Sequence, residues 1–461
     1  MRDAILIDFG STFTKVVAAS GQEKRILFTA CFPSTVKNDA RIGLFQCLDG
    51  AKQAMGEKAF SEAAKLASSS AAGGLRMAVV GLSKTLSITA GRNTAFGAGA
   101  KILKTFSGRI SAEDAEAIVL SQVEIVLFCG GYEKGNTSMI LHNAEVLANS
   151  EINVPVIYAG NSSVAKDVRR QFVMRGKECY IVSNIIPQVG ELDTAGAEEI
   201  IRDVFMKRIV NMKGLDRVSS ALDAVLMPTP AAVLSAGELL SRGWGNSAGL
   251  GPLMIVDIGG ATTDIHSYAH HTPYLGAKII GAQEAYARRT VEGDLGMRES
   301  SDSLAEETGW DRLAQKTGLP VDKLKKSIEH RVKVNGYLAD SSEEVKIDGE
   351  LACAAARISA RRHTGVLEHV HSGCCKLIQK GKNLTEVNWI IGTGGPIIHS
   401  ENPWEILQGV LADRQKEPDV LLPEKAQFFL DADYVLYAVG LLKEIDPQAA
   451  LEIVKKSIKK I

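Results

Sequence analysis

The feature that most constrains the fold is a strand, an acidic turn and a return strand that occur twice, about 250 residues apart. The first copy reads A-I-L-I-D-F-G-S-T-F-T-K-V-V, with an apolar strand at 4–7 and a β-branched return. The second reads L-M-I-V-D-I-G-G-A-T-T-D-I-H-S-Y, with a strand at 253–256, a turn at 257–263 and a return at 264–268. In both copies an Asp ends the strand, a Gly follows two residues later and hydroxyl residues come next. The repeat predicts two lobes related by internal duplication.

Between the two hairpins the pattern changes to short apolar runs that end in Gly or Asn. They lie at 75–82, 123–131 and 154–161. Helix-like stretches such as 92–106 and 112–121 separate them, and this alternation predicts a parallel α/β unit, at about 75–180, inserted in the first lobe. Its turns G-G-Y-E-K-G-N and A-G-N-S-S are of a kind that binds anions, but such turns more often only pack, and we favour packing.

The second half predicts a helical region and a third glycine turn. Residues 282–385 are mostly helical in pattern and charged, and a strand at 389–391 then meets G-T-G-G-P. The phrase D-A-D-Y-V-L-Y-A-V-G begins a helix capped near Asp431 or Asp433. We therefore predict an N-terminal lobe at 1–250 with the insert, and a C-terminal lobe at 251–461 with a helical subdomain.

Composition excludes several classes of protein. Among the 461 residues, 53 basic and 54 acidic side chains give a net charge of −1, so we expect no nucleic-acid and no membrane partner. The seven cysteines are scattered, no signal-peptide pattern opens the sequence and no apolar run reaches the ~20 residues of a membrane span, so we expect a cytoplasmic protein. The 43 glycines beside 13 prolines favour tight turns and phosphate loops.

The two hairpin turns carry the groups that a polyphosphate needs. Gly and hydroxyl residues direct backbone N–H groups into a small nest, and Ser11, Thr12, Thr262 and Thr263 add hydroxyl donors. A strand-end carboxylate repels phosphate unless a divalent cation lies between them, so these acids are candidate Mg²⁺ ligands. They are Asp8 and Asp257. The third turn, at 392–396, has no acid and suits close approach by a nucleoside.

The order D-F-G-S-T-F-T-K, P-T-P-A-A-V, D-I-G-G-A-T-T-D, G-T-G-G-P, A-D-Y-V-L-Y-A-V-G resembles the phosphate-one, connect-one, phosphate-two, adenosine and connect-two motifs of the actin, sugar-kinase and heat-shock chaperone ATPase superfamily. Within it, G-L-S-K-T-L-S-I-T-A-G-R-N-T-A-F-G-A-G-A-K, V-I-Y-A-G-N and D-I-G-G-A-T-T-D-I-H-S look like the glutamate mutase accessory protein family, called MutL or GlmL. That family is unrelated to the mismatch-repair protein of similar name.

The resemblance implies an α/β fold of two ribonuclease-H-like, actin-like ATPase lobes around a nucleotide cleft. It also implies an ATP-driven reactivating chaperone that binds ATP and Mg²⁺. The partner would be an adenosylcobalamin-dependent amino-acid mutase, glutamate mutase or an aminomutase, in which damaged cobalamin is exchanged for intact cobalamin. Which mutase is served, whether cobalamin is contacted directly and whether the chain forms a homodimer are left open.

Site residues carry over by motif. The catalytic candidates are Asp8, Asp257 and Asp264, of which Asp8 and Asp257 are also the metal ligands. The residues expected to bind the cofactor are Gly10, Ser11, Thr12, Phe13, Lys15, Gly259, Gly260, Ala261, Thr262, Thr263, Gly392, Thr393, Gly394, Gly395 and Pro396. Residues 228–233 and 438–440 would be crossing helices whose small side chains let the lobes hinge.

One residue departs from the pattern of the heat-shock chaperone ATPases. Met227 stands where their connect-one segment has Glu before Pro-Thr, so a carboxylate that assists the metal or the attacking water is missing. We hypothesise slow hydrolysis, or a substitute base such as Asp264 or Glu191.

Three other functions stay open from the sequence. A small-molecule kinase uses the same lobes, and an iron–sulfur activator of radical dehydratases would use cysteines such as Cys374 and Cys375. The third is a nucleotide-binding scaffold without turnover.

His266, His270 and His271 have no acid at ligand spacing and are expected on the surface or in a turn.

Overall fold

The computed structural model describes residues 3–10, 13–33, 40–69, 75–210, 222–334, 336–370 and 377–461. The chain divides into two compact units. The first contains Met1–Ser235, Gly281–Arg288 and Gly440–Ile445. The second contains Ala236–Ile280, Arg289–Val439 and Asp446–Ile461.

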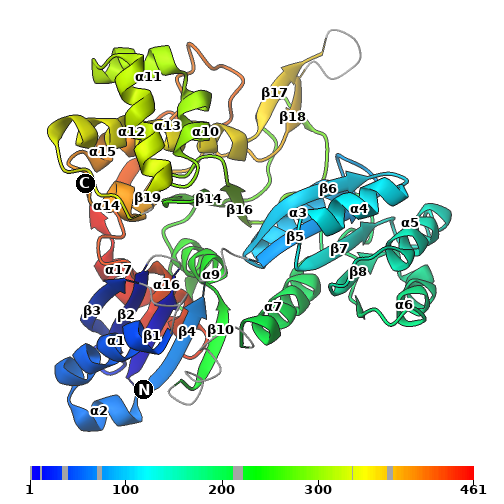
Figure 1. Ribbon diagram of the computed structural model, residues 1–461, viewed down its shortest axis with the longest axis horizontal. Helices are drawn as coiled ribbons and strands as arrows, with labels where there is room; N and C mark the ends of the chain where they lie inside the picture. The colour runs from blue at the N-terminus through cyan, green and yellow to red at the C-terminus, as the bar shows by residue number, and fades with distance from the viewer. Residues whose placement is uncertain are drawn as a thin grey trace. The chain divides into compact units, whose positions relative to one another are not determined.

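The first sheet belongs to the first unit and is built around the first hairpin (Figure 1). Its strands are β1 (Ala4–Phe9), β2 (Phe13–Ser20), β3 (Arg25–Pro33), β4 (Ala64–Ser69) and β10 (Ala224–Pro228), in the order β10-β4-β1-β2-β3. β2 is antiparallel to β1 and to β3, whereas β4 is parallel to β1 and to β10. Alternate residues of β1, such as Ile5 and Ile7, are buried with Leu44 of helix α1 (Ala40–Met55), which α2 (Glu57–Glu62) follows.

A second sheet of the first unit is formed by residues 75–181. Its strands β5 (Leu75–Gly81), β6 (Ala100–Ser107), β7 (Ile125–Gly130), β8 (Val156–Gly160) and β9 (Cys179–Ile181) are all parallel, in the order β6-β5-β7-β8-β9. Its helices are α3 (Ser87–Gly97), α4 (Ala112–Leu120), α5 (Ser138–Asn149), the 3-10 turn η1 (Ser162–Val164), α6 (Ala165–Val173) and α7 (Ala195–Val210). Val79 is buried with α3 and α7, whereas Val80 is buried with α4, α5 and α6, so helices cover both faces.

The helix predicted over 92–106 is wrong in its second half. α3 ends at Gly97, the chain turns at Gly99 with a φ of +88°, and residues from Ala100 onward pair with β5 as strand β6. Two glycines two residues apart stop the helix, and pairing with a parallel strand then makes residues 100–107 extended.

The second half of the chain repeats the order of the first sheet. Its strands are β13 (Leu253–Ile258), β14 (Thr263–Tyr268), β16 (Ala287–Glu292), β19 (Trp389–Thr393), β20 (Gln427–Leu430) and β21 (Lys459–Lys460). Their order is β16-β14-β13-β19-β20-β21, so strands three, two, one, four and five follow each other as in the first sheet. Both sheets are therefore ribonuclease-H-like, and the predicted α/β fold of two duplicated lobes is confirmed.

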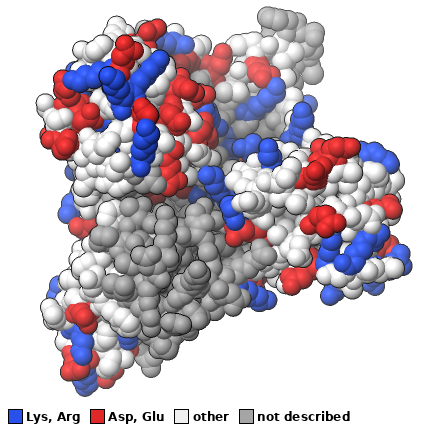
Figure 2. Space-filling model, in the orientation of Figure 1, with Lys and Arg blue, Asp and Glu red and all other residues white. Residues whose placement is uncertain are grey.

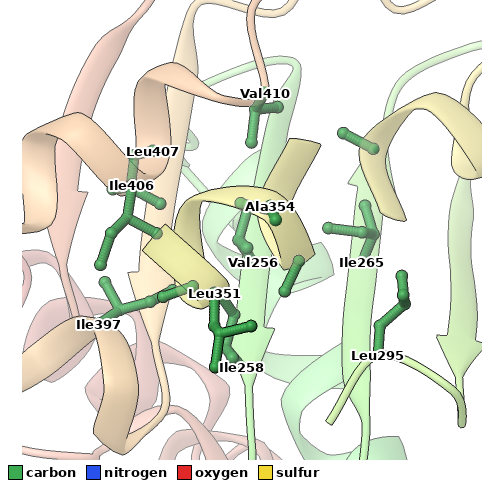
Figure 3. Packing of buried hydrophobic residues seen from close by; sticks show 14 of the residues in the cluster. Val256, Ile258, Ile265, Leu295, Leu351, Ala354, Ile397, Ile406, Leu407 and Val410 are labelled. Atoms are coloured by element: carbon green, nitrogen blue, oxygen red, sulfur yellow. The ribbon is translucent and has the colours of Figure 1, made fainter. Parts of the chain in front are cut away.

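Helices cover one face of this sheet. They are α10 (Ser301–Thr308), α11 (Trp310–Thr317), α12 (Val321–Lys333), α13 (Ser342–His363), α14 (Gly395–Ile398) and α15 (Pro403–Gln408). Figure 3 shows Val256 and Ile265 of the sheet packed near Ala354 of α13, within one buried apolar cluster. The remaining elements are β11 (Gly243–Trp244), β12 (Ser247–Ala248), β15 (Lys278–Ile279), β17 (Val366–His369), β18 (Leu377–Lys380) and α17 (Pro447–Ser457).

Two further helices, α9 (Thr229–Arg242) and α16 (Leu436–Lys443), approach each other closely. A Cβ atom added to Gly440 would lie 2.0 Å from the carbonyl oxygen of Ala232, so this contact requires glycine. The division between the two units falls inside both helices.

The described residues on one face of the protein agree with the balanced composition. On the face drawn in Figure 2, basic and acidic side chains are interspersed. In the described part of the chain, no helix is both long enough and apolar enough to cross a membrane.

Candidate functional site

The turns of the two hairpins are closed by the same hydrogen bond. The amide of Gly10 donates to the carbonyl of Phe13 at 3.0 Å, and the amide of Gly259 donates to that of Thr262 at 2.9 Å. A Cβ on Gly10 would lie 2.5 Å from the Phe13 oxygen, so the turn excludes other residues there. The repeated sequence pattern therefore encodes the same closing hydrogen bond in both hairpins. Ser11 and Thr12 lie outside the described residues.

Asp8 lies in a row of polar residues that crosses the first sheet. It is opposite Lys15 on β2 and beside Ser68 on β4, and directly paired residues point to the same face. Only 3% of Asp8 is exposed. Its Oδ1 accepts hydrogen bonds from the hydroxyls of Thr229 and, at 3.4 Å, Ser68.

Burial raises the pKa of the Asp8 carboxyl above its ordinary value, and Lys15 and the two hydroxyls oppose this rise. Thr229 belongs to the P-T-P motif, but its contact with Asp8 was not predicted. Nothing in the sequence predicts the contact of Ser68 with Asp8, apart from the place of Ser68 at the end of a strand.

Met227 occupies the next position of the same row. It pairs with Ser68 on the neighbouring strand and is buried. A carboxylate at this position would point to the face that carries Asp8. The residue that departs from the pattern of the heat-shock chaperone ATPases therefore lies in the same row of the sheet as Asp8.

In the second unit, Asp257 lies between Asp264 of β14 and Thr393 of β19 in the strand register. Gly394 follows with a φ of +89°, and a Cβ there would lie 2.7 Å from the Asp257 Oδ1 and 2.2 Å from the Ile258 oxygen. The third glycine turn thus lies directly against the end of β13, and only glycine permits this approach.

The phosphate-two turn has its carbonyl groups held on one side. Gly259 accepts from the amide of Met297 at 3.1 Å, and Gly260 accepts from the amides of Arg298 and Glu299 at 2.7 and 3.0 Å. The Ser300 hydroxyl donates to the Ala261 carbonyl at 3.2 Å. In a planar trans peptide the C=O and the following N–H point in opposite directions. The amides of Gly260, Ala261 and Thr262 are therefore directed away from residues 297–300, as a nest for an anion.

Three polar side chains of β14 are buried. Thr263 is buried, and its hydroxyl donates to the Leu295 carbonyl at 2.7 Å. Asp264 is buried, and its Oδ2 forms an ion pair with Arg289 at 2.8 Å. The expectation that His266 is a surface or turn residue is wrong, because it lies within the strand and is 1% exposed. Burial, followed by the charge of Arg289, holds the pKa of His266 well below its ordinary value, so it is neutral.

The third turn is tied to the start of α16. The Thr393 hydroxyl donates to the Asp431 Oδ2 at 3.1 Å, and Asp431 accepts from the amides of Val435 and Leu436. Asp431 lies before the N-cap position of α16, and its carboxylate satisfies amides at the start of the helix. A Cβ on Gly392 would lie 2.7 Å from Ile397, so this glycine packs against the core. Gly395 and Pro396 form the first residues of α14.

The glycine turns of the insert are satisfied internally, as favoured from the sequence. The Glu133 carboxylate accepts from the Ser162 amide at 3.1 Å and from the Asn184 side chain at 2.8 Å. A carboxylate of the chain itself thus occupies the place that an anion would take. Glu191 is exposed in the loop before α7, and its carboxylate accepts from Gln188.

Metal clusters other than the hairpin acids find no support within the described ranges. No group of three or more His, Cys, Asp or Glu side chains there is placed to hold a metal ion. Cys374 and Cys375 lie outside those ranges, and so does the iron–sulfur interpretation that depends on them.

The described amides of the second turn fit a phosphate group, and the strand-end acid of each hairpin fits a divalent cation. Amides in a nest bind phosphate oxygens, and Mg²⁺ takes one or two carboxylates together with phosphate oxygens and waters. The raised pKa of Asp8 shows that Lys15 does not fully compensate its buried charge. A cation beside Asp8 would supply that compensation, and Asp257 offers the corresponding carboxylate in the second hairpin.

Known proteins resemble this chain in sequence over nearly its whole length. A family model described as "MutL protein" matches residues 4–458. The chain is 37% identical over 459 residues to "Protein MutL" of Clostridium tetanomorphum, and the match covers 99% of each. Among solved structures, xylulose kinase from Bifidobacterium adolescentis is 11% identical, with 98% of this chain and 92% of that chain covered and a TM-score of 0.32. A propionate kinase from Francisella tularensis is 9% identical, with 96% and 100% covered and a TM-score of 0.30. Scores of this size carry no argument, and the fold rests on the strand order.

Proposed function

This chain belongs to the MutL protein family, and from that premise we propose that it is an ATP- and Mg²⁺-dependent reactivating chaperone for an adenosylcobalamin-dependent amino-acid mutase. The motifs quoted above resemble the glutamate mutase accessory proteins, which supports glutamate mutase or an aminomutase as the partner. In this proposal, damaged cobalamin leaves the mutase and intact coenzyme replaces it, at the expense of slow ATP hydrolysis.

One observation supports the nucleotide part above all others. The same closing hydrogen bond, donated by a glycine amide, occurs after β1 and after β13, each time two residues after a strand-end carboxylate. A packing role would not require an acid in either copy, whereas a phosphate-bound cation would use both. That a single nucleotide contacts both turns stays a prediction from the motifs.

The chain's own groups then have separate roles. Asp8 and Asp257 hold Mg²⁺ or its waters, and the hydroxyls of Thr229 and Ser68 fix the orientation of the Asp8 carboxylate. The amides of the second turn donate to phosphate oxygens, and Gly394 lets backbone approach the nucleoside. Bound Mg²⁺ supplies neutralisation of the phosphate charge. Because Met227 stands in the row with Asp8, no carboxylate at that position activates water, and we propose that hydrolysis is slow for this reason.

The partner surface in this proposal is the insert at about 75–180. In its sheet β6 lies on one side of β5, whereas β7, β8 and β9 follow on the other side. Open parallel sheets bind ligands at the carboxyl ends of the strands where the order changes side in this way. Lys84 and Lys134 follow these two strands and are exposed. One buried apolar cluster joins the insert to the first sheet, so deleting the insert would uncover core residues. Charge reversal at Lys84 and Lys134 is the better test, with loss of mutase binding and unchanged ATP binding expected.

The decisive experiment is rescue of a mutase that has been inactivated by damage to its cobalamin. The full-length chain with ATP and Mg²⁺ should restore activity, and Asp257→Ala should not. Asp311→Ala, an exposed acid on α11, is the matched control and should behave as the unchanged chain. Equal rescue without ATP would contradict the proposal. ATP consumption that depends on an added sugar or polyol would favour the kinase alternative instead.

A further inference from the structure

Arg298 takes part in two separate sets of contacts in the second unit. Its backbone amide donates to the carbonyl of Gly260 in the phosphate-two turn at 2.7 Å. Its guanidinium donates to both carboxylate oxygens of Asp348, at 3.1 and 2.9 Å, and its Nε donates to the Tyr337 carbonyl at 2.9 Å. Only 12% of the Arg298 side chain is exposed. A single residue therefore joins the turn to helix α13.

Asp348 is shared with a second arginine, on α12. The Nε of Arg331 donates to the Asp348 Oδ1 at 2.9 Å, and its Nη1 donates to Glu344 at 2.6 Å. The Arg331 side chain is fully buried. Both guanidinium groups also lie over the ring of Tyr337, at 5.8 Å for Arg298 and 5.3 Å for Arg331. The network thus extends from the turn through α13 to α12.

The glycines around the turn show how little freedom this segment has. A Cβ on Gly296 would lie 2.4 Å from the carbonyl carbon of Ala261, so residues 296–300 lie in direct contact with the turn. The bidentate pair of Arg298 and Asp348 has fixed geometry, because both the guanidinium and the carboxylate are planar. The place of the Arg298 amide is consequently set by the helices as well as by the local backbone.

We infer that Arg298 is a positioning residue for phosphate binding: anchored on Asp348, it holds the amides of Gly260, Ala261 and Thr262 in the direction in which they donate. This inference rests on the proposed nucleotide function and adds to it a coupling between the turn and helices α12 and α13. Phosphate bound at the turn favours one placement of these helices, and by reciprocity that placement favours phosphate.

The test compares ATP with adenosine, which lacks the phosphates but keeps the groups that the third turn would contact. Affinities of the full-length chain are measured by calorimetry, with thermal unfolding as a check of the fold. Arg298→Lys and Asp348→Asn should each weaken ATP binding about tenfold or more, which is the loss seen when residues that orient metal ligands are mutated. Both variants should leave adenosine binding within about twofold.

The matched control is Arg361→Lys on α13. The Arg361 guanidinium also forms a two-pronged pair, with Glu417 at 2.9 and 2.7 Å, and donates to the carbonyls of Gly409 and Leu411. It has no hydrogen bond to the turn among the contacts of the described residues. Its replacement should lower stability and leave the ratio of ATP to adenosine affinity unchanged.

The double variant of Arg298→Lys with Asp348→Asn should be no weaker than the worse single variant, since both remove one anchor. Two results would overturn the inference. One is an equal loss of ATP affinity in Arg298→Lys and Arg361→Lys, and the other is a double variant in which the losses of ATP-binding free energy add. Tighter ATP binding in Asp348→Asn would do so too, because it would mean that a released Arg298 contacts phosphate itself. If the unchanged chain binds no ATP, the proposed function fails, and this inference fails with it.

Discussion

Asp264 lies opposite Asp257 on the neighbouring strand, at the position where Lys15 lies opposite Asp8 in the first hairpin. In the first hairpin a lysine faces the strand-end acid, whereas in the second a further acid faces it and pairs with the buried Arg289. The two hairpins therefore share their strand pairing and the hydrogen bond that closes the turn, and they differ in charge. Replacing the acids should separate their roles.

The first prediction concerns the buried charge of Asp8. Its pKa is raised in the folded chain, so it contributes most to stability below its unfolded pKa of about 4, and this contribution is lost as pH rises. Without metal and nucleotide, Asp8→Asn should therefore raise the Tm at pH 7, by about 2–4 °C for each kcal/mol gained, and the gain should vanish near pH 4. Thermal unfolding across this pH range measures it. A lower Tm for the variant at pH 7 would contradict the prediction.

In the presence of Mg²⁺ and ATP, the unchanged chain should have a higher Tm than Asp8→Asn. Binding to the folded chain raises its Tm through mass action, and Asp8→Asn removes a proposed metal ligand. The unchanged chain should gain stability on addition of both, and the variant should gain little. A matching gain in the variant would exclude Asp8 as a ligand.

A third prediction separates a structural from a catalytic role for Asp264. Asp264→Asn removes a charge from a buried ion pair with Arg289 and should cost about 3–5 kcal/mol in the free energy of unfolding. Joint replacement by Leu at 264 and Met at 289 should cost less, because neither charge is then buried. Urea unfolding measures both. If Asp264→Asn keeps full stability and loses only ATP turnover, Asp264 is the substitute base.

The fourth prediction uses two helical glycines. Gly440→Ala should destabilise by about 1–3 kcal/mol, because the added methyl group meets the Ala232 backbone. Gly349→Ala on α13 meets no atom within 4 Å and should stabilise by about 0.5–1 kcal/mol. Equal effects in urea unfolding would mean that α9 and α16 do not approach as described.

The fifth prediction addresses Met227, which lies in the row with Asp8 and Ser68. If a missing carboxylate limits the proposed hydrolysis, Met227→Glu should raise the single-turnover rate, by up to about 100-fold. Met227→Gln has a similar size and no charge, and should not. The same rate in both variants would assign the slow step elsewhere.

The sequence predicted the parts of the site that lie close together along the chain. The spacing of Asp8 and Gly10, repeated at Asp257 and Gly259, defines a local turn and was recognisable without a structure. The hydroxyls on Asp8 were not, because Ser68 and Thr229 are 60 and 221 residues away and reach it only through parallel strand pairing.

Two errors have the same physical origin. His266 looked like part of a polar turn, but the pairing of β14 with β13 buries it. The stretch after Gly99 looked helical, but its pairing with β5 makes it a strand. In both cases a non-local partner set the environment, which local composition does not contain.

The order of the strands also affects the synthesis of the chain. β4 ends at Ser69 and its partner β10 begins only at Ala224, so this side of the first sheet stays open until the insert has left the ribosome. Open strand edges invite wrong pairing. The same unit also includes Gly281–Arg288 and Gly440–Ile445. Most of the first unit is thus synthesised by Ser235, but the unit is complete only once Ile445 has been made.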